Sequence, residues 1–181
     1  MRKKAYFLII FFCFLPLFWV DADTIGQKTD FIIDPSYSPS NQNKISATLR
    51  KVSSHLYFYF DDNWWNNLNP QEVKNMEDIM IGLSNEFDLT IYPKATALYG
   101  TEWNPGIDKD SKITLLFYQK KEEMKGYFRN TDEYEKIVAP LSNQREMLYF
   151  NVDNIYSPLL NEFLAHEFSH LIMFNQKERK Y

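Results

Sequence analysis

The chain contains one cysteine, Cys13, so no disulfide within a single molecule can hold its fold together. A domain without such cross-links must gain its stability from a buried apolar core or from a bound ligand. The 181 residues are 45% hydrophobic, and 15 phenylalanines and 12 tyrosines supply large side chains for a core. Composition therefore predicts one domain with an aromatic-rich interior.

An apolar segment at residues 5–20 follows three basic residues at the N-terminus. It is shorter than the roughly 20 residues that a membrane-spanning helix needs. With the small-residue ending Val20-Asp21-Ala22, it predicts that residues 1–22 are a secretory signal peptide. An uncleaved N-terminal anchor is the alternative. We therefore expect a secreted or extracytoplasmic protein with no stable membrane insertion after signal cleavage.

The net charge bears on the class of partner. The full chain carries a formal charge of −4, and loss of three basic residues and Asp21 with the signal peptide brings the mature chain to −6. An acidic surface disfavours nucleic acid, because phosphate recognition needs basic side chains. No cationic amphipathic stretch indicates a membrane surface. The expected partner is a protein, a peptide or another small substrate.

Residues 23–44 are rich in proline, serine and asparagine and lack a sustained apolar period. We interpret them as a leader or a propeptide-like linker that precedes a domain at residues 45–181. The alternation from Ile45 and the strand-forming run at residues 55–60 predict a two-stranded hairpin. Two more apolar runs predict further strands: residues 113–118, which should be buried, and residues 147–152.

Two helices are predicted from their starting patterns. Asn69-Pro70-Gln71-Glu72 supplies a cap, a first-turn proline and a third-position glutamate, and it predicts an amphipathic helix over residues 70–86. Ser157-Pro158 is a similar start for a second helix that continues from Glu162 to Phe174. Strands followed by this helix indicate an α+β domain.

The second helix carries His166-Glu167-Phe168-Ser169-His170. Residues four apart lie on one helix face, roughly 6 Å from each other, so His166 and His170 can present ring nitrogens to one tetrahedral Zn²⁺. Glu167 lies about 100° round the helix and can reach a metal-bound water rather than the metal. The motif predicts zinc ligands at His166 and His170, and Glu167 as the general base toward a water whose pKa zinc lowers to about 7.

The third zinc ligand is not evident, although a catalytic zinc usually has three protein ligands. The extended metzincin pattern is excluded, because Met173 and Gln176 stand where it needs glycine and histidine. Three other residues have little geometric support as ligands: Glu178, Asp153 and His55, of which the last is expected to be structural. The alternative interpretation of the motif is an exposed polar stripe on a packed helix.

Five blocks of sequence together resemble bacterial hyicolysin-type zinc metallopeptidases over about residues 45–175. The blocks are residues 101–108, 113–117, 126–128, 142–151 and 164–172. The resemblance implies a zincin-like fold of the gluzincin kind, that is, a thermolysin-like N-terminal subdomain with a mixed sheet and an active-site helix. It also implies a third ligand that is a glutamate on a further helix beyond the motif, so the domain is expected to be incomplete at its C-terminus.

The resemblance further places the strand at residues 147–152 at the edge of the active-site cleft. An exposed strand edge offers unpaired backbone groups to an extended peptide, which gives affinity with little sequence preference. A peptide substrate is therefore expected to lie along this strand.

The principal hypothesis is a secreted zinc metalloendopeptidase that hydrolyses peptide bonds, with Zn²⁺ as its cofactor. The first alternative is a truncated or degenerate peptidase-like domain without activity. The second is a secreted module that binds carbohydrate or protein through exposed tryptophans, with Trp64, Trp65 and Trp103 as candidates. Asp108-Lys109-Asp110 and the charged segment at residues 120–125 are expected to be solvated.

Overall fold

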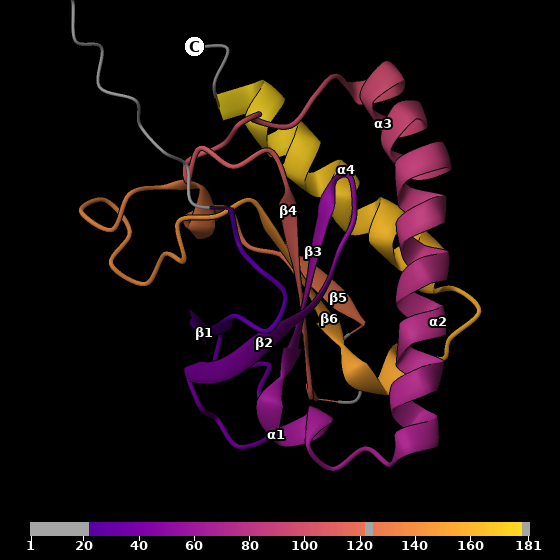
Figure 1. Cartoon of the computed structure of the whole chain (residues 1–181). Coiled ribbons are helices and arrows are strands. Elements are labelled where there is room, and N and C mark those ends of the chain that lie inside the picture. The colour runs from indigo at the N-terminus through magenta and orange to yellow at the C-terminus, as the bar shows by residue number, and fades with distance from the viewer. Residues whose placement is uncertain (1–21, 122–124, 179–181) are drawn as a thin grey trace, which may run out of the picture.

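One mixed sheet of six strands forms the centre of the computed structural model, which describes residues 22–121 and 125–178 (Figure 1). The strands are β1 (Lys28–Ile32), β2 (Lys44–Val52), β3 (Leu56–Asp61), β4 (Ile113–Tyr118), β5 (Gly126–Phe128) and β6 (Met147–Asn151). Their order in the sheet is β1-β2-β3-β4-β6-β5. Pairing is antiparallel from β1 to β3, parallel from β3 through β4 to β6, and antiparallel between β6 and β5. The expected α+β architecture with a mixed sheet is confirmed.

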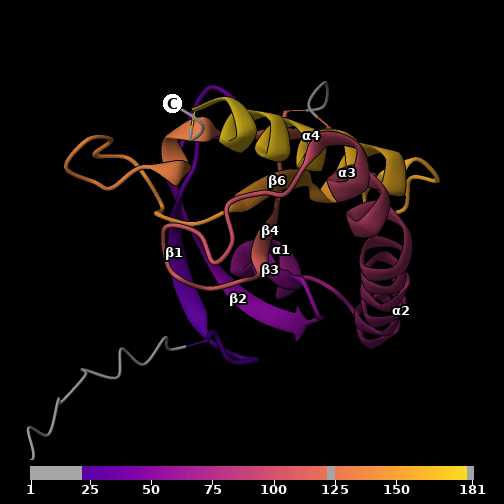
Figure 2. The same cartoon turned by 90° about the horizontal axis from the view of Figure 1, so that it is seen from above.

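Helices pack on the sheet. Among the described residues they are α1 (Asp62–Trp65), α2 (Pro70–Glu86), α3 (Tyr92–Tyr99) and α4 (Leu160–Glu178). A π-helical turn, η1 (Phe87–Ile91), joins α2 to α3, and two 3₁₀ turns, η2 (Asn130–Glu133) and η3 (Val152–Asn154), flank β6 in sequence. Seen from above, α4 lies across the sheet beside β6 and contacts α3 (Figure 2). No helix in the described part of the chain is long and apolar enough to cross a membrane.

Local capping explains where α2 begins. The Asn69 side chain accepts hydrogen bonds from the backbone N–H groups of Gln71 and Glu72, and the Glu72 carboxylate accepts one from the backbone N–H of Asn69. These reciprocal bonds satisfy N–H groups that have no partner inside the helix. The helix predicted over residues 70–86 is confirmed. The second predicted helix begins at Leu160, two residues after Pro158.

Two apolar cores lie on opposite faces of the sheet, because side chains alternate along each strand. The helix-covered core joins sheet residues such as Phe117 to α2 and α4 side chains such as Met80 and Phe168. The opposite core contains Tyr59 and Tyr149 and is covered by β1 and the loops around it. Strands β3, β4 and β6 are buried along their whole length. The predicted hairpin and both later strands are confirmed.

Residues 23–44, interpreted from composition as a leader or propeptide-like linker, pack on the sheet and include strand β1. Strand β1 pairs with β2, and Phe31 is buried with 1% of its surface exposed. Asp23 forms an ion pair with Arg145, which lies close to the start of β6. The prolines, serines and asparagines that suggested a linker make the turn-rich connection from β1 to β2. Whether these residues are removed as a leader stays a prediction.

The charged segment that begins at Lys120 was expected to be solvated, and for Lys120 this is wrong. Its side chain is 2% exposed, and its ammonium nitrogen lies 4.4 Å from the centre of the Tyr127 ring. Burial lowers the pKa of Lys120 to about 7. Asp108 is half-buried rather than fully solvated, and burial raises its pKa to about 6.

Glu146 directly precedes β6, and its carboxyl is buried. Its Oε1 accepts a hydrogen bond from the backbone N–H of Ile107 at 3.0 Å. A side chain at Gly106 would collide with its other oxygen, so the loop approaches closely only because that residue is glycine. Burial, with a smaller contribution from the Asp108 carboxylate, raises the pKa of Glu146 well above the ordinary 4.5.

We predict that Glu146→Gln weakens the pH dependence of stability. A carboxyl with a higher pKa in the folded than in the unfolded chain holds its proton more tightly when folded, so stability falls as pH rises above the unfolded pKa. The wild type should lose free energy of unfolding between about pH 5 and pH 8, and the variant should lose less. Urea denaturation at both pH values measures this, with exposed Glu135→Gln as the control. An unchanged pH dependence in Glu146→Gln would contradict the prediction.

Candidate metal centre

Helix α4 separates an apolar face from the face that carries the histidines. Its buried side chains pack on the sheet: Leu160, Leu164, Phe168, Leu171 and Ile172. His166 and His170 are exposed on the other face, one helical turn apart. Packing of the apolar face therefore fixes the direction in which the two imidazoles point.

The imidazoles of His166 and His170 converge as the motif predicted. Their Nε2 atoms are 3.0 Å apart, and the ring planes are at 90° with centres separated by 4.6 Å. Two nitrogens on one tetrahedral zinc, each bound at about 2.0–2.1 Å, lie roughly 3.3 Å from each other. The pair therefore fits two positions of a zinc site with a small change in side-chain torsions.

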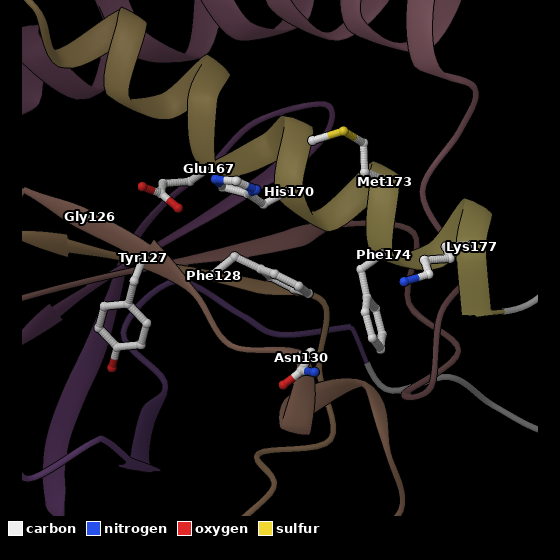
Figure 3. Close-up of a pocket in the computed structure, with 9 residues that line it drawn as sticks. All are labelled: Gly126, Tyr127, Phe128, Asn130, Glu167, His170, Met173, Phe174 and Lys177. Carbon is white, nitrogen blue, oxygen red and sulfur yellow. The ribbon is translucent and has the colours of Figure 1, made fainter.

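Glu167 lies between α4 and the sheet rather than in open solvent. Its side chain is 8% exposed, and its carboxylate accepts a hydrogen bond from the backbone N–H of Phe128 in β5. Burial raises the pKa of Glu167, while the neighbouring His166, His170 and Lys120 oppose the shift. In Figure 3 its carboxylate lies beside the His170 ring and above β5. A carboxylate so placed can act on a water at the histidine pair.

Gly126 allows β5 to approach Glu167. A Cβ added to Gly126 would lie 3.1 Å from Glu167 Cγ and 3.2 Å from Phe150 Cε1, both tighter than ordinary contact. Any larger residue would therefore push β5 away from α4. The roles of Gly126 and Phe128 depend on a contact between distant segments, and their one signal in the sequence is a glycine followed by two aromatic residues.

The edge strand beside the motif is β5, not the strand at residues 147–152. Strand β6 has β4 on one side and β5 on the other, so the prediction that it forms the edge is wrong. The sequence pattern missed β5 because three residues are too few to show alternation. The edge of the sheet is therefore one strand further out than predicted, at β5, and β5 contacts α4.

A pocket of about 520 Å³ opens between β5 and the C-terminal half of α4 (Figure 3). It is lined by Gly126, Tyr127, Phe128, Asn130, Glu167, His170, Met173, Phe174 and Lys177. The pocket thus contains the candidate base and one of the two histidines.

The other candidate ligands do not join the histidine pair. Asp153 and Glu178 are exposed, and His55 forms a 2.8 Å contact with Asp88 and stacks on Tyr92. Within residues 22–121 and 125–178, no group of three or more His, Cys, Asp or Glu side chains is arranged to hold a metal. In this part of the chain, His166, His170 and Glu167 thus come together without a further candidate ligand beside them.

The tryptophans considered as a binding surface at Trp64 and Trp65 are partly buried. The rings of both pack against Phe60, and the Arg50 guanidinium lies 4.5 Å from the centre of the Trp65 ring. Their contacts are those of a structural cluster around α1.

Comparison with known proteins adds one relationship. No protein-family model matches the chain. The chain is 26% identical over 154 residues to the neutral metalloprotease ShpI of Staphylococcus hyicus. The matched region covers 76% of this chain and 32% of that protein. The chain thus spans about a third of the length of this relative. The similarity supports a distant metallopeptidase-like relationship, and the specific type of peptidase stays a prediction.

We predict opposite effects for the same change at two glycines. Gly126→Ala should cost about 1–3 kcal/mol in the free energy of unfolding, because the added methyl overpacks the contact with Glu167. Gly82→Ala, in the middle of α2 with nothing within 4 Å of the added carbon, should stabilise by about 0.8–1 kcal/mol. Chemical denaturation of both variants measures the difference. Equal effects at the two positions would show that β5 does not depend on this close approach.

Proposed function

We propose that this chain contributes the metal-binding helix and the edge strand of a secreted, zincin-like zinc metallopeptidase. The observation that carries the proposal is the convergence of two imidazole nitrogens within 3.0 Å, beside a buried carboxylate. The metallopeptidase-like relative supports the class of reaction. The signal pattern at residues 1–22 supports export. A protein or peptide is the proposed substrate.

His166 and His170 would hold Zn²⁺ through their Nε2 atoms, as two of its ligands. When bound, zinc polarises a carbonyl oxygen and makes water a nucleophile near neutral pH. A third ligand is required for a catalytic centre of this kind, and it must come from outside the described residues. Two further roles fall to residues of this chain: Glu167 would move a proton, and strand β5 would orient the substrate.

Glu167 is proposed as the general base. Its carboxylate would take a proton from the attacking water and later pass it to the leaving amine. The hydrogen bond from Phe128 and the contact with Gly126 hold the side chain beside the histidine pair.

Strand β5 is proposed as the surface on which an extended peptide lies. It is at the edge of the sheet and borders the pocket that contains Glu167 and His170. The Phe128 N–H is already donated to Glu167, so a peptide would pair with the other backbone groups along this edge. Such backbone pairing binds peptides with little dependence on their sequence. Side-chain pockets beside the strand must then supply any preference.

We predict that Glu167→Gln, made in a full-length protein that contains the third zinc ligand, abolishes peptide hydrolysis and leaves zinc binding intact. The change removes the proton acceptor and keeps a side chain of the same size, and both imidazoles remain in place. Loss of general base catalysis should lower turnover by about 10²–10⁴-fold. Release of a fluorescent product from a quenched peptide measures turnover, and elemental analysis measures zinc.

Glu162→Gln is the matched control, because Glu162 is an exposed glutamate in the first turn of the same helix. It should leave both zinc content and turnover unchanged. Equal turnover in Glu167→Gln and wild type would sink the proposed role of Glu167. A wild type that binds zinc and cleaves no peptide would favour the non-catalytic alternative.

A further inference from the structure

We infer that the pocket between β5 and α4 is a substrate subsite for an aromatic or long apolar side chain on the N-terminal side of the cleaved bond, with an acidic residue preferred next to it. This inference rests on the proposed function and adds a preference in sequence. It assigns specificity to residues beyond the zinc motif, namely Phe128, Phe174 and Lys177.

One side of the pocket is lined by apolar side chains. Phe128 comes from β5 and Phe174 from α4, and their ring centres are 5.7 Å apart at an angle of 52°. Met173 extends the same wall and is 44% exposed, and Tyr134 meets the other edge of the Phe174 ring at 6.1 Å. A volume of about 520 Å³ is within the range of side-chain and small-ligand pockets. An aromatic side chain would lie against this pair of rings.

The direction of β5 places this pocket relative to the cleaved bond. The strand runs from Gly126, which lies beside the stem of Glu167, to Phe128, whose backbone N–H binds the Glu167 carboxylate and whose ring packs on Phe174. Antiparallel pairing is the more stable arrangement of two strands. A peptide antiparallel to β5 has its N-terminal residues next to Phe128 and its later residues next to Gly126. The pocket therefore receives a residue that precedes the bond at Glu167.

The charges around the pocket are divided between its two ends. Glu167 is the one acidic residue among its lining side chains and lies at the end with the histidines. Lys177 lies at the far end, one turn beyond Phe174 on α4, and is exposed. Asn130 adds an amide group on the opposite wall. An acidic side chain next to the apolar one would meet Lys177, whereas a basic one would be repelled.

Peptide binding tests the subsite without requiring hydrolysis. Four fluorescently labelled peptides would differ in two adjacent positions only: Asp-Phe, Lys-Phe, Asp-Ala and Lys-Ala. Fluorescence anisotropy with the full, zinc-loaded chain should show the tightest binding for Asp-Phe. Replacing phenylalanine by alanine in the peptide should weaken binding about tenfold, as expected for loss of a buried aromatic side chain.

Two variants test the named residues separately. Phe174→Ala should remove the preference for phenylalanine and keep the preference for aspartate. Lys177→Glu should reverse the order of Asp-Phe and Lys-Phe, and as an exposed change it should leave the fold intact. Lys74→Glu is the control, because it makes the same change of charge at an exposed position on α2, and it should change neither preference.

The outcomes separate this inference from the proposed function. Equal binding of all four peptides, or equal reversal by Lys74→Glu, would overturn the subsite. If the chain also cleaves the peptides, mass spectrometry should place the phenylalanine before the cut, and a cut before the phenylalanine would overturn the assigned direction. Preferential binding without cleavage would support the subsite, and the comparison of Glu167→Gln with the wild type decides the proposed catalysis separately.

Discussion

The close approach of β5 to α4 at Gly126 is the contact on which the candidate site depends. The glycine lets the strand lie against the stem of Glu167, and the backbone N–H of Phe128 then binds its carboxylate. The same approach creates the pocket that runs along the edge strand past His170. A residue with a side chain at position 126 would separate the edge strand, the base and the pocket together.

Helix α4 supplies the other half of this arrangement. Its apolar face is fixed in the core through residues such as Phe168, so the histidines on the opposite face have a defined direction. Their nitrogens converge because residues four apart share a helix face. Rigid support of this kind is what a metal site needs from a protein. The chemistry proposed for His166, His170 and Glu167 therefore rests on packing as much as on the motif.

Features encoded by local sequence were predictable. The capping box at Asn69 and the four-residue spacing of the histidines each depend on neighbours within one helical turn, and both are present in the structure. Features that depend on distant segments were not. Residues 23–44 look like a linker by composition, yet β1 pairs with β2, and Lys120 looks solvated until β5 covers it. The edge strand was missed for the same reason, because strand order is a property of the whole sheet.

The most direct test of this account is the zinc stoichiometry of the purified chain, measured by elemental analysis for the wild type, His166→Ala and His170→Ala. The account predicts that the wild type binds close to one zinc per molecule and that each single variant loses it, because both imidazoles face one site. Ser169→Ala, between the two histidines, should bind as the wild type does. Zinc content that is unchanged in either histidine variant, or a wild type that binds none, would contradict the assignment of a metal centre to α4.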